Sequence, residues 1–186
     1  MLPGVYKWQI DEVDYQKNII QTILRKRGIE TEKDIQAYLN PDKKNLHSPY
    51  LLNDMKKAVD RITLALHAQE EIVVYGDYDV DGITSTSILY MFLKSQGYKV
   101  SYYIPDRLSE GYGLNQSALK DIANKSKLVI TVDTGIAAVS EVEYAKELGI
   151  DIIITDHHEC QEVLPDAYCI INPKRNDSTY PFKYLA

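Results

Sequence analysis

Three short segments of the sequence carry carboxylates and imidazoles at spacings that suit metal ions. The first is residues 76–82, in which Asp77, Asp79 and Asp81 alternate with other residues between two glycines. Alternate side chains of an extended chain point the same way, so we expect these three carboxylates to converge. Carboxylates that lie close together raise one another's pKa unless cations neutralise them, and hard divalent ions are their usual partners. The segment therefore predicts a metal site.

Two other roles for this segment are an acidic turn in solvent and a calcium-binding EF-hand loop. A lone Asp-Gly pair is usually a turn, but three alternating aspartates between an apolar strand and a helix favour a metal site. An EF-hand loop also needs a glutamate at its twelfth position, which this sequence lacks. We expect Gly82 to allow the turn, and Thr84 and Ser85 to cap the helix that follows.

Two further segments each follow an apolar run. Residues 131–135 contain Asp133, and residues 155–158 place Asp156 before two adjacent histidines. Alone, the first of these is also an ordinary strand-to-helix turn with the aspartate as the cap. At the end of a strand, one histidine can bind a metal while the other faces a substrate, and Asp156 can fix a histidine tautomer by accepting its hydrogen bond.

From residue 71 onward, apolar runs typical of buried strands alternate with helical patterns. The expected strands are 72–75, 99–104, 128–132, 151–155 and 168–171, and the expected helices are 84–96, 115–124 and 137–148. This alternation predicts an α/β fold, a doubly wound and mostly parallel five-stranded sheet with helices on both faces. Ligands bind outside the carboxyl ends of such strands, where all three segments fall. Together the segments suit a two-metal site, which catalyses in-line attack on phosphorus.

Residues 1–70 are expected to form a helical segment ahead of a catalytic domain over 71–186. The three helices expected there cover about 13–26, 31–39 and 53–69. Thr31, followed by Asp34 at the third helical position, resembles the start of a helix. In the third helix we expect one apolar stripe to face the core. Its members are Met55, Val59, Ile62 and Leu66.

The composition is that of a globular protein that does not bind nucleic acid by bulk charge. The chain has 186 residues, of which 45% are hydrophobic and 26% charged, and its net charge is −6. Proteins that coat DNA need a basic face, whereas an enzyme can hold phosphate through carboxylate-bound metal ions. No apolar run reaches the roughly 20 residues of a membrane helix, and the start lacks the pattern of a signal peptide. We therefore expect a cytoplasmic protein without membrane contact.

The motifs resemble those of the DHH phosphoesterases. Residues 156–158, Asp-His-His, are similar to the signature that gives this family its name, residues 76–82 resemble its first motif, and residues 132–135 resemble its second. Within the family, the form of the first motif and the stretches 104–107 and 110–113 are most similar to RecJ-type exonucleases. The resemblance extends over essentially the whole chain.

The resemblance implies a site for manganese or magnesium, with two ions in the complete enzyme. The implied metal ligands are Asp79, Asp81, Asp133 and His157, with Asp77 also in the site. It further implies that His158, beside Asp156, contacts the scissile phosphate. Related enzymes often have a histidine where this sequence has Tyr75, and this difference affects the balance of the two metal sites.

The resemblance also implies contacts to the substrate from the stretch after the second expected strand. Arg107 would meet the nucleic-acid backbone or its 5′ end, a role that suits a bidentate phosphate binder. Tyr112, between Gly111 and Gly113, could touch a nucleotide. A tight turn with a packing tyrosine is the alternative for these three residues.

As a member of this group, the protein would hydrolyse single-stranded DNA from the 5′ end, in DNA repair and recombination. A single-strand-binding protein or a helicase would be a further partner. The family carries another metal-binding aspartate and a second domain downstream of the region seen here. The chain is therefore expected to be an N-terminal fragment that lacks the C-terminal part of its own protein and need not be active alone.

Two other classes of function are open on the sequence. One is a DHH enzyme for small substrates, namely oligoribonucleotides, cyclic dinucleotides or pyrophosphate. The helical segment 1–70 disfavours a pyrophosphatase, in which the first motif typically opens the chain. The other is a non-catalytic replication scaffold, which the intact acidic motifs disfavour because a scaffold has no use for their mutual repulsion.

Overall fold

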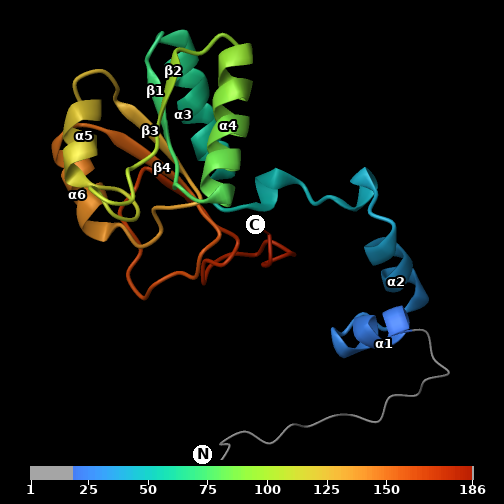
Figure 1. The fold of residues 1–186 in the computed structure, drawn as a ribbon. Coiled ribbons are helices and arrows are strands. Elements are labelled where there is room, and N and C mark those ends of the chain that lie inside the picture. The colour runs from blue at the N-terminus through green and yellow to red at the C-terminus, as the bar shows by residue number, and fades with distance from the viewer. Residues whose placement is uncertain (1–18, 186) are drawn as a thin grey trace, which may run out of the picture. The chain divides into compact units, whose positions relative to one another are not determined.

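The computed structural model describes residues 19–185, which are divided between Leu46 and His47 into two compact units. The first unit contains α1 (Ile19–Lys26), α2 (Glu32–Leu39) and the short 3-10 helix η1 (Lys43–Asn45), shown in blue in Figure 1. Residues 13–18 of the predicted first helix, Val13 among them, lie outside the described residues.

Helix α2 begins as the sequence predicts. Thr31 Oγ1 accepts a hydrogen bond from Asp34 N at 3.1 Å, and its hydroxyl donates to the Asp34 carboxylate at 2.6 Å. This contact satisfies one of the backbone N–H groups that the first turn of a helix leaves unpaired. The apolar residues of α1 are mostly exposed. Leu24 is the one buried residue of this helix, and Ile19 is 71% exposed.

The second unit is built on five strands that all run parallel. They are β1 (Ile72–Tyr75), β2 (Val100–Tyr103), β3 (Leu128–Val132), β4 (Asp151–Thr155) and β5 (Cys169–Ile171). Their order in the sheet is β2-β1-β3-β4-β5. The chain builds outward from β1 in one direction and then, from β3, in the other, so the topological switch point lies between β1 and β3. The predicted α/β fold is confirmed.

Both faces of the sheet are covered, because alternate residues of each strand face opposite helical layers. Val73 and Ile152 pack with α5 (Gln116–Ile122) and α6 (Val139–Glu147). Val74 packs with the other layer, which α3 (Met55–His67) and α4 (Val80–Ser95) form. Figure 1 shows these two pairs of helices on opposite sides of the strands. The strands therefore read as continuous apolar runs, as parallel strands buried on both faces do.

Helix α3 follows the 3-10 helix η2 (Pro49–Leu51) and buries a different stripe from the one predicted. Its buried residues are Ala58, Arg61 and Ala65, whereas the predicted Val59 is 37% exposed. The two alanines have small side chains, which allow the helix to pack closely on the sheet, and the larger apolar residues lie at the margin. The predicted stripe was therefore rotated from the observed one.

Helix α4 begins at Val80, not at residue 84 as predicted. Asp79 is its N-cap, and its side chain accepts a hydrogen bond from Gly82 N at 2.9 Å. Thr84 and Ser85, the predicted caps, lie inside the helix and donate their hydroxyls to backbone carbonyls of its first turn. The prediction was wrong because an aspartate at the end of the preceding loop already caps the free N–H groups.

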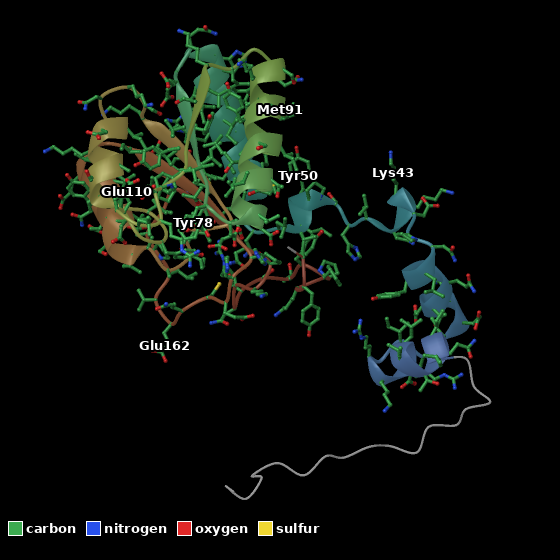
Figure 2. The ribbon with its side chains drawn as sticks, in the orientation of Figure 1. Lys43, Tyr50, Tyr78, Met91, Glu110 and Glu162 are labelled. Atoms are coloured by element: carbon green, nitrogen blue, oxygen red, sulfur yellow. The ribbon has the colours of Figure 1, made fainter. Side chains whose placement is uncertain are left out.

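The outer side of α4 is apolar, with Ile88 and Met91 exposed to solvent. Figure 2 labels Met91 on this helix. Even so, within residues 19–185 no helix is both long enough and apolar enough to cross a membrane.

A network of two ion pairs joins α3 of the second unit to Glu70 and to the start of β4. Arg61 is 8% exposed and donates two hydrogen bonds to Glu70, at 2.8 and 2.9 Å, and one to Asp151 at 2.6 Å. Its replacement would leave the partly exposed carboxylates of Glu70 and Asp151 without the cation that pairs them.

We therefore expect Arg61→Ala to lower the free energy of unfolding by about 3 kcal/mol, measured by urea denaturation. Lys56→Ala is the matched control, since its exposed pair with Asp60 on the same helix is worth at most about 0.5 kcal/mol. Equal effects of the two substitutions would contradict the structural role of the Arg61 network.

Candidate metal centre

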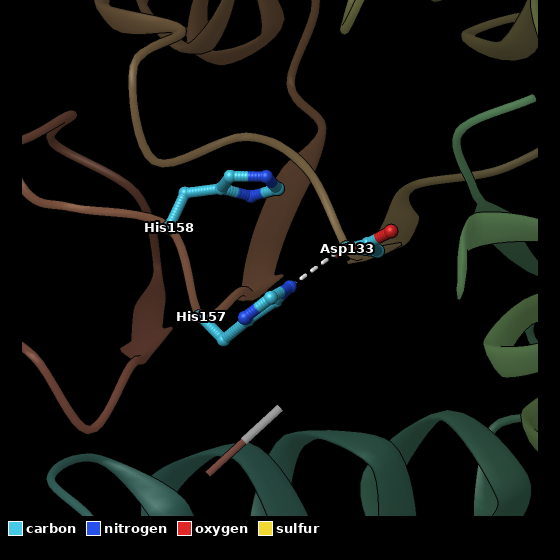
Figure 3. Close-up of side chains that lie close together, drawn as sticks. All are labelled: Asp133, His157 and His158. Atoms are coloured by element: carbon cyan, nitrogen blue, oxygen red, sulfur yellow. Dashed lines mark hydrogen bonds and ion pairs between the residues drawn. The ribbon is translucent and has the colours of Figure 1, made fainter. Parts of the chain in front are cut away.

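Two of the three predicted segments meet in direct contact at the carboxyl ends of β3 and β4. Asp133 follows β3, and its Oδ1 lies 2.9 Å from Nε2 of His157, which follows β4 (Figure 3). His158 lies beside them, and its ring centre is 4.7 Å from that of His157. Asp133, His157 and His158 each offer one ligand atom, and these atoms all lie within 4.8 Å of one another.

Asp156 holds the two histidines of this cluster in place through hydrogen bonds. One oxygen of its buried carboxylate accepts hydrogen bonds from the amides of His157 and His158, at 2.7 and 3.0 Å, and lies 2.7 Å from His158 Nδ1. The other oxygen accepts from Ile136 N at 3.0 Å. Because a carboxylate can only accept, His158 Nδ1 carries the proton and its Nε2 is left for other partners. The sequence predicted this contact between Asp156 and one histidine.

The electrostatics of the cluster favour a bound cation. Burial, and then the charge of Asp79, raise the pKa of Asp133 against the opposing effect of His157. Burial opposes the charge of His158, but Asp156 and Asp133 outweigh it and raise the pKa of that histidine. A buried carboxylate whose charge is disfavoured gains from a nearby positive ion.

The backbone of Asp133 is itself unusual. Its φ is 59°, in the left-handed region, and its amide donates to Thr155 O at 3.0 Å. Few residues other than glycine adopt this conformation, and aspartate is among those that tolerate it. Strained backbone of this kind gathers at functional sites, where the surrounding structure holds it.

The three aspartates of the first motif lie close to the cluster but do not converge in the way predicted. Asp77 is buried, Asp79 is the exposed N-cap of α4, and Asp81 lies in the first turn of that helix. The alternation argument was wrong because the chain is extended only up to the cap and is helical from Val80. Burial raises the pKa of Asp77, and the charge of Asp79 raises it further.

Close backbone packing fixes the loop of the first motif. Gly82 faces the backbone of Asp77, and a Cβ at Gly82 would lie 2.6 Å from the Asp77 carbonyl carbon. No rotation of a side chain can relieve a clash with backbone. Glycine at this position therefore allows the turn, as the sequence predicts, by close approach and not by a left-handed φ.

A cleft of about 450 Å³ opens beside the cluster. It is lined on its polar side by Asp81, Asp133, Asp156 and His157, and on its apolar side by residues such as Ile88 and Ile171. Asp81 of the first motif and Asp133 of the second thus border the same space. The cleft lies beside the topological switch point, where open α/β sheets bind ligands.

The predicted substrate residues lie on the loop between β2 and α5. The guanidinium carbon of Arg107 lies 5.4 Å from the ring centre of Tyr78, and Tyr78 meets the exposed Tyr112 edge-on at 6.3 Å. Gly111 and Gly113 both have φ of 82°, which only glycine adopts readily. Figure 2 labels Tyr78 at this end of the sheet.

Tyr112 belongs to the surroundings of the cluster. Burial raises its pKa, and the charges of Asp77, Asp156 and Asp133 add to the effect. The tight turn and the exposed tyrosine thus occur together, so the packing alternative does not exclude contact with a ligand.

The donor set fits a divalent metal ion. Oxygen and imidazole donors suit Mn²⁺, and oxygen donors suit Mg²⁺. The facing atoms of Asp133 and His157 are close enough to share one ion, and Asp156 fixes the orientation of His158 beside them.

A model of the DHH family, N-terminal domain, matches residues 71–180. The chain belongs to the DHH family.

Two relatives with similar sequences agree with this assignment. The chain is 43% identical over 198 residues to the single-stranded-DNA-specific exonuclease RecJ of Bacillus subtilis, and the match covers 100% of this chain and 25% of that protein. The RecJ of Escherichia coli is 34% identical over 170 residues, with 90% of this chain and 29% of that protein covered. The chain thus spans about a quarter of the length of these relatives.

Solved structures give the same picture. A crystal structure of exonuclease RecJ bound to manganese matches with a TM-score of 0.67 and 32% identity, over 73% of this chain and 35% of that one. RecJ from Thermus thermophilus in complex with Mn²⁺ matches with a TM-score of 0.66 and 28% identity, over 84% and 22% of the two chains.

Sequence reasoning missed three residues around the site of this DHH protein. Tyr78 was treated as a spacer between aspartates, although its place inside the first motif was a usable signal. Thr131 donates its hydroxyl to Thr134 O at 2.8 Å and so shapes the turn that carries Asp133. Asn172 is fully buried and donates to His158 O at 3.0 Å.

We expect Gly82→Ala to displace the Asp77 backbone, lower the free energy of unfolding by more than about 1 kcal/mol and weaken Mn²⁺ binding. Gly97→Ala is the control for metal binding. Alanine is strained at the Gly97 φ of 85° and also lowers stability, but Gly97 lies just past the far end of α4 with no atom within 4 Å of its Cβ position. Titration calorimetry with Mn²⁺ measures the metal affinity of both variants, and only Gly82→Ala should change it.

We also expect Asp133→Asn to stabilise the metal-free chain at neutral pH while it abolishes stabilisation by Mn²⁺. The pKa of Asp133 is raised in the folded chain, so its contribution is favourable below the unfolded pKa and is lost as the pH rises through the folded pKa. Asparagine tolerates the same left-handed backbone. Melting curves from pH 4 to 8, with and without Mn²⁺, measure both effects. A lower melting temperature of the metal-free variant at pH 7 would contradict the electrostatic account.

Proposed function

We propose that this chain provides the metal-binding core of a Mn²⁺- or Mg²⁺-dependent phosphodiesterase that removes nucleotides from the 5′ end of single-stranded DNA. The observation that carries the proposal is the contact of Asp133 with His157 beside the Asp156–His158 pair, at the carboxyl ends of β3 and β4 in a DHH-family sheet. The printed names of the relatives, single-stranded-DNA-specific exonucleases, support the choice of substrate.

In this proposal the metal ligands come from all three motifs. Asp133 and His157 hold one ion, and Asp79 and Asp81 complete the metal sites from the start of α4, with Asp77 beneath them. Metal ions held by these residues would polarise the phosphate and activate water for in-line attack. The closeness of Asp79 to Asp133, which raises the pKa of Asp133, supports a shared site.

His158 and Asp156 act on the scissile phosphate in this scheme. Asp156 keeps the proton on His158 Nδ1 and so leaves His158 Nε2 for the substrate. The raised pKa of His158 favours its protonated form, in which Nε2 donates a hydrogen bond to a phosphate oxygen. Developing negative charge on that oxygen would strengthen the bond, so the histidine would stabilise the transition state more than the bound substrate.

The loop between β2 and α5 supplies the contact to the strand. Arg107 would pair with backbone phosphate near the 5′ end, and Tyr112, between Gly111 and Gly113, would stack on a base. Stacking on an aromatic ring is tolerant of sequence and is worth about 1–3 kcal/mol per base. A local arginine and two tyrosines suit an acidic protein that grips a strand at one place only.

The organisation of the longer protein follows from the same proposal. Residues 71–186 would form the catalytic domain, as the start of the family match at residue 71 supports, and residues 1–70 would precede it as a helical segment whose last helix, α3, packs on the sheet. Further metal-binding and strand-binding parts would come from the remaining length seen in the relatives. A cytoplasmic location, and a single-strand-binding protein or a helicase as partner, are part of this proposal.

The test is to place the chain in the matching stretch of the Bacillus subtilis relative and to assay the chimera with Mn²⁺. We expect loss of label as mononucleotide from 5′-labelled single-stranded DNA before any loss from 3′-labelled DNA. His158→Ala should lower kcat at least about 100-fold, because the transition state loses a charged hydrogen bond. His67→Ala, an exposed histidine on α3, is the control and should leave kcat unchanged.

Small substrates provide the contrast. Cleavage of pyrophosphate, a cyclic dinucleotide or a di-ribonucleotide without trimming of long DNA would contradict the exonuclease and support a DHH enzyme for small substrates. Tight DNA binding with no cleavage at any Mn²⁺ concentration would support a non-catalytic scaffold.

A further inference from the structure

A buried tyrosine ties the substrate loop, residues 104–115, to strand β1, which lies between β2 and β3 in the sheet. Tyr75, the last residue of β1, is fully buried, and its hydroxyl donates a hydrogen bond to Gly113 O at 3.0 Å. Asn115 Nδ2 donates to the same hydroxyl at 3.1 Å. The hydroxyl therefore has one acceptor and one donor partner, and both belong to this loop.

Glu110, in the middle of the loop, accepts hydrogen bonds from three residues. One of its oxygens accepts from the Tyr103 hydroxyl and, at 3.2 Å, from Asn115 Nδ2, while the other accepts from Asp106 N at 2.8 Å. The Asp106 amide, and then the Tyr103 hydroxyl, hold the pKa of Glu110 below its usual range. A charged acceptor strengthens each of these bonds.

Asn115 connects this network to helix α5. Its Oδ1 accepts from Ala118 N at 2.7 Å and so caps the helix, while its amide group donates to Tyr75 and Glu110. The ring of Tyr75 stacks on that of Tyr103 with centres 5.1 Å apart. The end of the loop and the start of α5 are thus fixed to the sheet together.

The groups that this network holds are the ones proposed to touch the substrate. Tyr112 immediately precedes Gly113, whose carbonyl the Tyr75 hydroxyl fixes. Arg107 lies next to Asp106, whose amide Glu110 fixes, and it reaches over Tyr78. A loop freed from the sheet would carry Tyr112 away from Asp133 and Arg107 away from Tyr78.

We infer that the Tyr75 hydroxyl is a positioning group for the nucleic-acid strand, which acts by holding Gly113 and Asn115 so that Tyr112 and Arg107 stand over the metal centre. The inference rests on the proposed function, because it assigns a role to loop residues that contact the strand there. Tyr75, which stands where related enzymes often have a histidine, thus forms hydrogen bonds to the substrate loop.

The test uses Tyr75→Phe, which keeps the stacked ring and removes the hydroxyl. In the chimera with the Bacillus subtilis relative, KM for 5′-phosphorylated single-stranded DNA should rise about three- to tenfold, the equivalent of one or two hydrogen bonds. The kcat and the Mn²⁺ affinity should change less than about twofold, because the metal ligands stay in place. Tyr102→Phe, an exposed tyrosine on β2 next to Tyr103, is the matched control and should change none of the three.

A second variant breaks the same bond from the other side. Asn115→Asp keeps the oxygen that caps α5 and loses the N–H groups that reach Tyr75 and Glu110. It should raise KM as Tyr75→Phe does. Hydrogen exchange of the amides of residues 106–113 should quicken in both variants, while exchange in β4 stays unchanged.

A double-mutant cycle separates positioning from a general loss of structure. If Tyr75 acts through the loop, Tyr75→Phe should have no further effect on KM once Arg107 and Tyr112 are both alanine. Fully additive effects, or an unchanged KM in folded Tyr75→Phe and Asn115→Asp, would overturn the inference. Failure of the proposed function would give a different result, because the wild-type chimera would then already be inactive on DNA.

Discussion

The carboxylate of Asp156 is the contact on which the site depends. It is almost fully buried, and a buried charge is tolerated only when hydrogen bonds surround it. One oxygen accepts hydrogen bonds from the backbone amides of both histidines and from the ring of His158. The other oxygen accepts a hydrogen bond from the amide of Ile136. The carboxylate therefore locks the loop after β4 to the turn after β3. The positions of Asp133, His157 and His158 follow from that lock.

The sheet provides a rigid edge for this assembly. β3 pairs with β1 on one side and β4 on the other, so the loops that follow these three strands leave the sheet side by side. The site carries costs that the fold must absorb, namely the left-handed backbone of Asp133 and the disfavoured charge of that carboxylate. Fully buried residues such as Ile130 and Ile153 flank it and supply the stability that offsets these costs.

Strands and their shared edge could be predicted from the sequence because runs such as Ile72–Tyr75 and Leu128–Val132 are apolar enough to be buried on both faces. The start of α4 could not, because a cap by Asp79 and a cap by Thr84 both fit the local pattern. The contacts of Tyr75 with Gly113 and Asn115 join residues about 40 positions apart. Nothing in local spacing indicates such contacts, and only the packed structure brings these groups together.

The most direct test of the central claim is to locate the ion itself. Crystals of the chain grown with MnCl₂ should show an anomalous scattering peak at bonding distance from Asp133 Oδ1 and His157 Nε2, with the Asp156–His158 contact unchanged. Absence of a peak between these two side chains at saturating Mn²⁺, in crystals that preserve the Asp133–His157 geometry, would contradict the account.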